Sequence, residues 1–180
     1  MLIRADRSFL LVVDIQAKLA PHIDGAAAAI GQTMTIIKAA RRLGVPVLAC
    51  EENPPGLGPT VPEVADLLPE GVTHPKMHFA CLANPGWPER IAALGRRQAV
   101  LCGMETHVCV LQSALSLKEA GYATFVVADA TSSRHAESRH LGLERLRAEG
   151  VGLVTTEMVV FEWLGQAGTD EFRELLALIK

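Results

Sequence analysis

Short apolar runs alternate with longer segments of helical periodicity along the whole of this chain of 180 residues. The first run, residues 8–14 (SFLLVVD), is almost continuously apolar and ends in an acid. Such a run is typical of a parallel strand that is buried on both faces. Residues 26–43 then place apolar side chains on one helical face, and Gly44 is suited to end that helix. This strand-then-helix unit recurs to the end of the sequence.

The same patterns locate the remaining elements. Strands are predicted at 8–14, 45–50, 72–74, 98–103, 123–129 and 152–155. Helices are predicted at 26–43, 62–68, 84–94, 106–120 and 135–149, followed by one or two more, the last at 169–178. Asn84 and Thr106 are the expected N-caps of their helices, and the Pro- and Gly-dense stretch 51–60 is expected to be a loop.

Regular alternation of strand and helix predicts an α/β fold with three layers, αβα. The sheet would hold about six parallel strands, with helices on both faces. The length fits one domain, 1–180, and no internal repeat or low-complexity segment interrupts it. In a sheet of this kind the ligand lies beyond the carboxyl ends of the strands. That rule selects Asp14 and the segments 51–60, 74–79, 103–109 and 129–134.

Composition excludes several classes of partner. The formal net charge is -3 and no basic run is present, so neither nucleic acid nor an acidic membrane surface is expected to bind. No apolar stretch approaches the roughly 20 residues that span a bilayer, and the first residues do not resemble a secretory signal. The four cysteines are too few for a disulfide framework, so they predict reduced thiols in a cytoplasmic protein. No Cys-x-x-Cys pair marks a metal site.

Cys109 is the most informative of the four cysteines. The chain runs from a strand through a sharp turn into a helix, and with Thr106 as N-cap the cysteine lies in the first helical turn. Unpaired backbone N–H groups and the helix dipole favour a thiolate there, and they can stabilise an oxyanion. The alternative, a small buried apolar side chain, is the interpretation for Cys50, Cys81 and Cys102.

Two charged residues at strand ends can assist a thiol. Asp14 closes the first strand, where a carboxylate would face the site and exchange a proton with the thiol and the leaving group. Its alternative role is to cap the turn that follows. Lys76 follows the third strand, where a fixed positive charge would keep the carboxylate and the thiolate ionised. Its alternative is an ordinary solvated lysine.

Other residues near these strand ends have less specific signals. His78 and His107 lie close in sequence to Lys76 and Cys109, so a Cys–His pair is an open alternative. Phe79 would form either a pocket wall or core packing. The loop Gly56-Leu57-Gly58 is either a lid with glycine hinges or a plain surface connection. Residues 132–134 (SSR) are expected to cap the next helix.

Several motifs together resemble the isochorismatase-like cysteine hydrolase superfamily. They are Asp-x-Gln at 14–16, the lone Lys76, and Gly-Met-Glu-Thr-His-Val-Cys-Val at 103–110. The likeness is closer to isochorismatase domain-containing proteins and bacterial YcaC-type hydrolases. With them the chain also shares Gly-Leu-Gly-Pro-Thr from position 56, Asp-Ala-x-Ser-Ser-Arg from 129 and Thr-Thr-Glu-x-x-x-Phe-Glu from 155. The resemblance covers nearly the whole chain.

The resemblance implies a role for each matching residue. Asp14 would be the general base, Lys76 the orienting and activating charge, and Cys109 the nucleophile that forms a thioester. The backbone N–H groups of Glu105 and Cys109 would form the oxyanion hole, next to a cis peptide between Met104 and Glu105. The residues expected to line the substrate pocket are Gln16, Leu57, His78, Phe79 and Met104.

Departures from the family narrow the expected reaction. Enzymes of this family that hydrolyse isochorismate, a vinyl ether, typically lack this cysteine. Nicotinamidases of the superfamily carry an Asp-x-His metal motif after the second strand, where this chain reads CEENP at 50–54. No metal and no cofactor are therefore expected, and nicotinamide is a less favoured substrate. His78 replaces a smaller polar residue of close relatives, which would change the shape of the pocket.

The leading hypothesis is therefore hydrolysis of a small amide C–N bond, or of a related acyl compound, through a thioester. One alternative keeps the fold but makes Cys109 an oxidation-prone thiol. Another is a catalytically quiet binding or scaffold protein. Relatives commonly form homo-oligomers. The C-terminal segment would pack either within its own subunit or against another subunit, through Trp163, Leu164 and the apolar face of 172–179.

Overall fold

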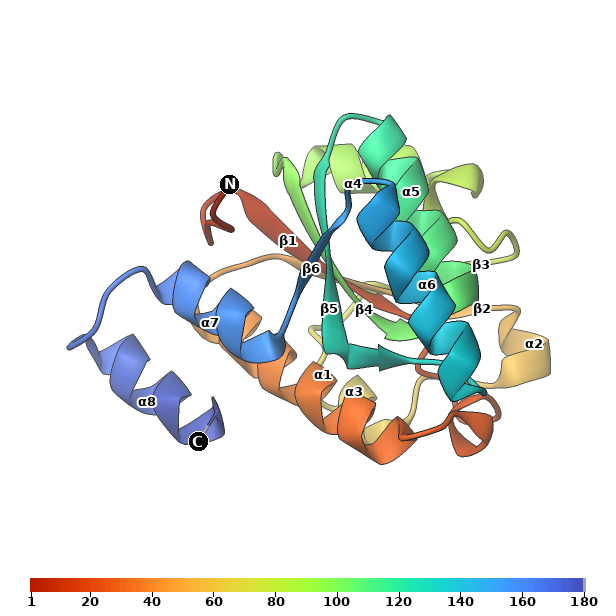
Figure 1. Ribbon diagram of the computed structural model, residues 1–180, viewed down its shortest axis with the longest axis horizontal. Coiled ribbons are helices and arrows are strands. Elements are labelled where there is room, and N and C mark those ends of the chain that lie inside the picture. Colours follow the sequence, from red (N-terminus) through yellow and green to blue (C-terminus); the bar gives the residue numbers. More distant parts are fainter. Residues whose placement is uncertain (180) are drawn as a thin grey trace.

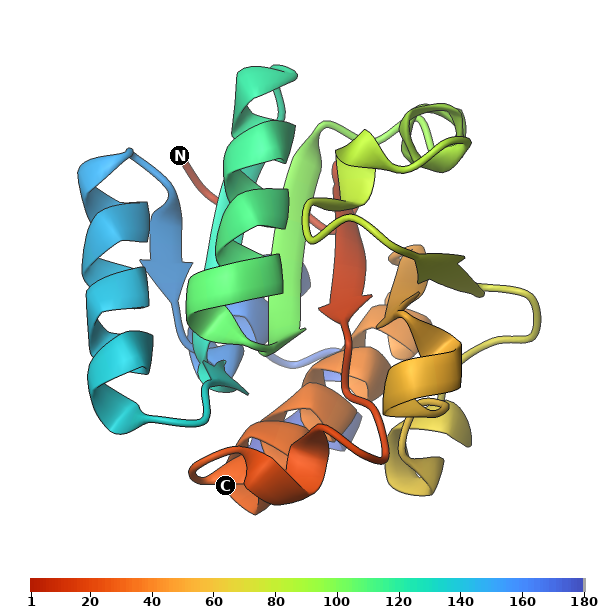
Figure 2. The ribbon, with the colours of Figure 1, turned by 90° about the vertical axis from the view of Figure 1, so that its right-hand side faces the viewer.

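A computed structural model describes residues 1–179 of the chain. Six parallel strands form one sheet in the order β3-β2-β1-β4-β5-β6, with helices on both of its faces (Figures 1 and 2). The strands are β1 (Ser8–Val13), β2 (Val47–Glu52), β3 (Thr73–Lys76), β4 (Gln98–Met104), β5 (Ala123–Ser132) and β6 (Gly152–Val154). The predicted three-layer α/β fold with six parallel strands is confirmed.

Eight α-helices and three short helical turns connect the strands within the described residues. The α-helices are α1 (Ala26–Arg42), α2 (Pro54–Leu57), α3 (Pro62–Ala65), α4 (Trp87–Ala93), α5 (Leu111–Glu119), α6 (Ala136–Ala148), α7 (Thr156–Leu164) and α8 (Asp170–Ile179). The turns are η1 (Ala20–His22), η2 (Cys81–Ala83) and η3 (Thr106–Val110). None of the helices within residues 1–179 combines the length and the apolar character that crossing a membrane requires.

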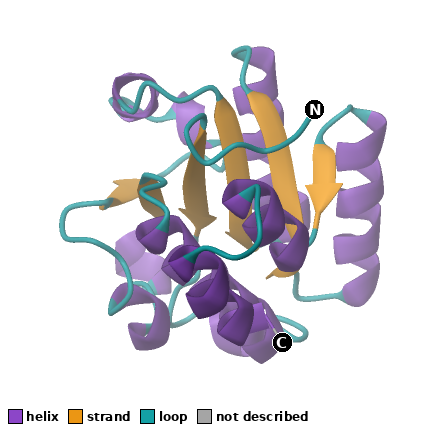
Figure 3. Ribbon diagram, turned by 90° about the vertical axis from the view of Figure 1, so that its left-hand side faces the viewer, coloured by secondary structure: helices purple, strands orange, loops and turns teal. Residues whose placement is uncertain are grey.

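The central strand β1 is buried along its whole length because both of its faces are covered. Leu10 and Val12 belong to an apolar cluster with side chains of α1, α3, α7 and α8. Phe9 and Leu11 point the other way, into a second cluster with side chains of α4, α5 and α6. Figure 3 views the sheet from the side of α7 and α8, with helices in front of the strands. Alternate side chains thus fill two cores, which explains the unbroken apolar run.

The strand order creates a point where the direction of winding reverses. From β1 the chain adds β2 and then β3 on one side, and it then crosses back to place β4 on the other side of β1. Both neighbours of β1 are hydrogen-bonded to it in parallel. Ligands of doubly wound sheets bind beyond the carboxyl ends of the strands at such a reversal. The edge formed by the ends of β1, β2, β3 and β4 is therefore the place to examine.

Three predicted strand ends were wrong, those of β2, β3 and β5. Strand β3 runs on to Lys76, two residues past its predicted end. Strand β2 continues two residues past the predicted end, because Glu52 pairs in register with Lys76 of β3. The stretch 51–60, predicted to be a loop, therefore begins with the last two strand residues and also contains the single helical turn α2. Strand β5 runs on to Ser132, past a register shift in its pairing with β4.

Two predicted N-caps were also wrong. Helix α4 begins at Trp87 behind Gly86, whose φ of 80° suits glycine, so Asn84 lies before the helix and does not cap it. Thr106 is fully buried, and its hydroxyl shares a hydrogen bond with the Thr131 hydroxyl at 2.9 Å. The segment that Thr106 opens is a single π-helical turn, η3, which leads into α5. Such turns are frequent at functional sites.

Candidate functional site

Four side chains from four neighbouring strand ends meet at the carboxyl edge of the sheet. Asp14 directly follows β1, Glu52 and Lys76 end β2 and β3, and Cys109 lies in the turn η3 that follows β4. An Asp14 oxygen, a Glu52 oxygen and the Cys109 sulfur all lie within 4.8 Å of one another. The expected convergence of Asp14, Lys76 and Cys109 is therefore present, and Glu52 is an additional member that the sequence interpretation missed.

Lys76 joins the two carboxylates. Its Nζ lies 2.6 Å from Glu52 Oε2 and 2.8 Å from Asp14 Oδ2. The hydrogen bond of good geometry goes to Glu52, whereas Asp14 Oδ2 receives none from any donor within residues 1–179. The ammonium contacts Asp14 as an ion pair at hydrogen-bond distance. A buried carboxylate oxygen is left available to accept a proton.

Exposure divides the four groups into an inner and an outer pair. The side chains of Asp14 and Lys76 are completely buried. Cys109 keeps 6% of its surface exposed, and the Glu52 side chain keeps 10%. Cys109 and Glu52 are therefore the two members of the site that keep some contact with solvent.

Backbone geometry fixes Asp14 in this position. Its φ of 49° is in the left-handed region, which aspartate tolerates better than most residues, and this turns the chain at the end of β1. The Asp14 amide donates to the Cys50 carbonyl at 3.1 Å. The Cys50 thiol in turn donates to Asp14 Oδ1, also at 3.1 Å. One carboxylate oxygen is thus anchored by a thiol while the other faces the ammonium.

Burial and charge set the protonation of the site. Burial raises the pKa of the Cys109 thiol, the charge of Asp14 raises it further, and Lys76 only partly offsets this. The expectation of a resting thiolate, based on the helix N-terminus, is therefore wrong. Burial also raises the pKa of Asp14 against the effect of Lys76. Burial alone would lower the pKa of Lys76, but the groups around it raise the pKa by more. Burial and the charge of Asp14 thus favour the thiol form of Cys109, and the surrounding groups favour the ammonium form of Lys76.

The other three cysteines are buried and, like Cys109, free of disulfides. Cys102 belongs to the core cluster on the α1 side, where burial raises the pKa of its thiol to about 12. Cys81 lies behind Cys50, with 3.6 Å between the two sulfurs. Only Cys50 therefore departs from the interpretation of these three as plain core residues, because its thiol contacts Asp14.

The residues expected to line the pocket lie in different settings. Gln16 is fully buried, and Met104 is fully buried within the core cluster on the α1 side. Leu57 is half-buried at the end of α2. His78 is exposed, and Phe79 is 50% exposed, just beyond Lys76. Only Leu57, His78 and Phe79 therefore present side-chain surface on which a substrate can pack.

Gln16 instead holds the end of β2 in place. Its Nε2 donates to the Glu52 carbonyl at 2.9 Å and to the Gly58 carbonyl at 2.7 Å. Its Oε1 accepts from the Glu52 amide at 2.8 Å. The Asp-x-Gln motif therefore places a carboxylate in the site and fixes the backbone of Glu52.

Asn84 holds the segment after Lys76 in a similar way, and the sequence interpretation missed this role. Its Oδ1 accepts from the amides of Met77 and His78 at 2.8 and 3.0 Å. Its Nδ2 donates to three carbonyl oxygens, those of His78, Ala80 and Cys81. The Asn-Pro pair had suggested an N-cap, which hid this use of the side chain.

The two histidines near the site bind other partners. His107 Nδ1 lies 2.9 Å from the Ser133 hydroxyl, and His78 Nδ1 lies 3.2 Å from Asn84 Oδ1. Neither ring shares a hydrogen bond with Cys109 among the residues described. The Cys–His alternative therefore has no support in the geometry.

The turn before Cys109 holds the amides expected for an oxyanion hole. The Met104–Glu105 peptide is cis, as the family resemblance implied. The Glu105 carbonyl accepts from the amides of Val108 and Val110 at 3.1 and 3.2 Å. The Glu105 side chain pairs with Arg134 at 3.0 Å. These contacts hold the turn that carries the Glu105 and Cys109 amides.

Asp14, Glu52 and Cys109 also have the spacing of a metal-ligand set. The Lys76 ammonium already lies within 2.8 Å of both carboxylates, so a cation would compete with it for the same oxygens. His74 and His78 are four residues apart, but His74 is in strand β3 and stacks edge-on against Trp87. The donor set therefore fits an internal ion pair better than a metal.

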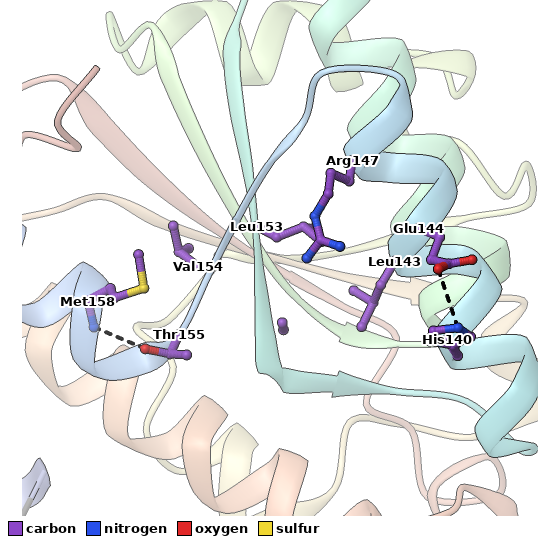
Figure 4. A pocket seen from close by; sticks show the side chains of 9 residues that line it. His140, Leu143, Glu144, Arg147, Leu153, Val154, Thr155 and Met158 are labelled. Atoms are coloured by element: carbon purple, nitrogen blue, oxygen red, sulfur yellow. Dashed lines mark hydrogen bonds and ion pairs between the residues drawn. The ribbon is translucent and has the colours of Figure 1, made fainter.

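A hollow of about 290 Å³ lies away from this edge, between α6, β6 and the start of α7. Figure 4 shows its lining, including His140 paired with Glu144 on α6 and the Thr155 hydroxyl that accepts from the Met158 amide. It contains none of the four converging side chains. Its lining offers no nucleophile beside a base.

Fold and site together define a doubly wound α/β protein with a buried thiol, carboxylate and ammonium at the reversal of its strand order. The sequence pattern of the isochorismatase domain matches residues 8–158. The chain belongs to this family.

Relatives and solved structures agree with that assignment. The chain is 37% identical over 173 residues to isochorismatase domain-containing protein 2 of Xenopus laevis, covering 96% of this chain and 83% of that protein. It superimposes with a TM-score of 0.92 and 33% identity on a structure described as MAR1 ribonuclease from Caenorhabditis elegans, covering 99% and 92%. The YcaC gene product of Escherichia coli, described as an octameric hydrolase of unknown specificity, shares the fold at a TM-score of 0.89 and 24% identity, covering 99% and 87%.

Proposed function

We propose that this protein hydrolyses a C–N bond of a small amide, or a related acyl compound, through a thioester on Cys109. The observation that carries the proposal is the setting of Asp14. Its Oδ2 is fully buried, lies 2.8 Å from the Lys76 ammonium, and belongs to a carboxylate beside the Cys109 sulfur. Such an oxygen is suited to take the proton of a thiol and pass it on.

The reaction follows from these groups. The Cys109 sulfur attacks the carbonyl carbon while its proton moves to Asp14, and the amides of Glu105 and Cys109 bind the oxyanion. Asp14 then returns the proton to the nitrogen as the C–N bond breaks, which leaves the amine and a thioester. Water attacks the thioester with Asp14 again as base, and the acid leaves with the thiol restored. No cofactor takes part.

Lys76 stabilises the charged forms in this cycle. Its ammonium contacts Asp14 before the proton moves and lies beside the developing thiolate as the sulfur attacks. A raised pKa of the thiol means that little thiolate exists beforehand, so proton transfer accompanies the attack. The roles are thus divided between a base that moves the proton and a cation that does not.

The cysteine favours amide hydrolysis over the reaction that names the family, since hydrolysis of a vinyl ether does not require a thiol nucleophile. A ribonuclease activity, suggested by the description of the Caenorhabditis elegans structure, is less compatible with this site. The carboxylates of Asp14 and Glu52, one fully buried and one partly exposed, would repel a phosphate group. The net charge of -3 on the chain acts in the same direction. The alternatives of an oxidation-prone thiol and of a quiet scaffold predict no turnover.

We further propose a cytoplasmic homo-oligomer with a small-molecule substrate. Four buried free thiols suit a reducing compartment. The octameric description of the YcaC structure makes self-association the expectation for this fold. Mass photometry of the purified protein would test the oligomeric state directly.

The proposal is tested by a panel of small amides, with release of ammonia or amine as the readout. The wild type and Cys102→Ala are expected to turn over the same amides, because Cys102 is a core residue on the α1 side. Cys109→Ala is expected to turn over none. Equal turnover by Cys109→Ala would refute the nucleophile, and RNA cleavage without amide turnover would favour the other activity.

A further inference from the structure

Glu52 is a charged group of the site that the proposed reaction does not use. It ends β2 with its carboxylate 2.6 Å from Lys76, closer than Asp14 is. Two hydrogen bonds between its backbone and the Gln16 side chain hold its position. A partly exposed glutamate that is fixed in this way presents its charge at one defined place.

The charges around Cys109 do not balance. Asp14 and Glu52 each contribute a negative charge, Lys76 contributes one positive charge, and the thiol is neutral at rest. The next ionic pair in the turn, Glu105 with Arg134, is balanced within itself. The site therefore carries one excess negative charge, within 4.8 Å of the sulfur.

The position of this charge matters for a substrate. The carbonyl that Cys109 attacks must come within bonding distance of the sulfur, and Glu52 is the carboxylate near the sulfur that is not completely buried. In a largely buried site, a charge at such a distance is screened much less than in bulk water. A substrate carboxylate would meet this charge directly, whereas an ammonium or a neutral amide would not be repelled.

We propose that Glu52 is a specificity-determining residue that restricts the site to uncharged or positively charged amides and excludes anionic ones. This inference rests on the proposed function, because it concerns the substrate of the same nucleophile. The substrate class it names is an amide whose acyl or amine part carries no carboxylate or phosphate. Glu52 acts here through its charge and takes no part in bond making.

Iodoacetamide and iodoacetate provide a matched pair of probes, because they have nearly the same size and differ by one negative charge. In both reactions the Cys109 sulfur forms a bond to carbon, iodide leaves, and the thiol proton goes to the buffer. The measurement is the second-order rate constant for alkylation of Cys109, followed by mass spectrometry of the peptide that contains it. The iodoacetamide-to-iodoacetate ratio is compared with the ratio for free glutathione, which cancels the intrinsic reactivity.

For the wild type we expect this ratio to exceed that of glutathione by about 10-fold or more. In Glu52→Gln the ratio should fall to within a few-fold of glutathione. A change in the thiol pKa affects both reagents equally, so it cancels in the ratio. Glu51→Gln is the matched control, because it removes the same charge from the preceding residue. The Glu51 carboxylate accepts hydrogen bonds from Thr60 instead, so this variant should keep the wild-type ratio.

Each outcome has a distinct meaning. A wild-type ratio equal to that of glutathione, or an equal ratio in wild type and Glu52→Gln, overturns the inference and leaves the nucleophile intact. A Cys109 that neither reagent alkylates overturns the proposed function and the inference with it. The wild-type comparison needs no variant, so the test stands even if Glu52→Gln does not fold.

Discussion

The Asp14 carboxylate contacts three other groups of the site. Its two oxygens face the Cys50 thiol and the Lys76 ammonium, and the Cys109 thiol lies beside the same carboxylate. The carboxylate therefore has two effects on Cys109 that oppose each other. Its charge raises the pKa of the thiol, while in the proposed reaction the same carboxylate accepts the thiol proton during attack.

Asp14→Asn separates these two effects. Amide turnover should fall by about 10²- to 10⁴-fold, because the base is lost. The pKa of Cys109 should fall at the same time, since the charge that raises it is gone, and alkylation by iodoacetamide should reach half its maximum at a lower pH. Asp129→Asn is the control, because the Asp129 carboxylate lies within β5 and accepts hydrogen bonds from the amide and hydroxyl of Thr156. Loss of both turnover and alkylation in Asp14→Asn would indicate a collapsed site and contradict this assignment.

At the scale of elements, the site depends on the passage from β4 into η3. Gly103 lies there with a φ of 118°, and a Cβ at this position would overlap the carbonyl of Val13, the residue before Asp14. Two neighbouring strand ends thus approach each other so closely that only glycine fits. The same contact sets the distance between the strand that carries Asp14 and the turn that carries Cys109.

Gly103→Ala should therefore destabilise the protein by about 3 kcal/mol or more, through both the overlap and the backbone conformation. Gly95→Ala is the control, with a φ of 64° but open space around the position, and should cost about 1 kcal/mol. Urea unfolding of the two variants gives the comparison. Equal losses of stability would show that the close approach does not matter.

The strands and helices could be predicted from the sequence because both faces of the sheet are buried, so each central strand is an apolar run bounded by turn residues. The ends of the strands were harder to predict. Glu52 could not be assigned to the site from the sequence, because β2 extends to Glu52 only through its pairing with β3. The sequence of β3, THPK, is too polar to reveal that pairing. Asn84 has the sequence signature of a cap, and only the fold shows that it binds the segment after Lys76.

Cys109 lies in the turn after β4, as the sequence motif predicted. The prediction that its thiol is ionised was wrong. The helix N-terminus argued for a thiolate, whereas burial and the charge of Asp14 outweigh it. Burial depends on how four strand ends close over the sulfur, which no local pattern reports. The position of a thiol at the edge of the sheet can thus be predicted from a strand–turn–helix motif more readily than its pKa.

At the scale of the whole molecule, the ion network of the site lies between the two apolar cores, with the Asp14 and Lys76 side chains wholly removed from solvent. Burying charges in this way contributes to stability only while every charge keeps its partner. The site is therefore a place where one substitution affects the entire fold.

Lys76→Met should destabilise the protein by about 3–5 kcal/mol at pH 7, because it leaves two buried carboxylates without a cation. Without Lys76 the pKa of the buried Asp14 carboxyl group should lie further above its unfolded value of roughly 4, so the cost of its charge applies above that pH and is lost as the pH falls. The gap in stability between variant and wild type should thus narrow from pH 7 to pH 4. Lys118→Met, at an exposed position of α5, should change stability by only about 0.5 kcal/mol at either pH. A gap that stays constant with pH would contradict the charge network.

The proposed reaction passes through one covalent intermediate, the acyl group carried by Cys109. Acid-quenched protein, taken during turnover of an amide from the panel, can be weighed intact and then as peptides. We predict a mass increase equal to the acyl group, confined to the peptide with Cys109 and removed by hydroxylamine. Two results together would contradict a thioester intermediate on Cys109. They are full turnover of the amide with no acyl group on Cys109 at any time, and equal turnover by Cys109→Ala.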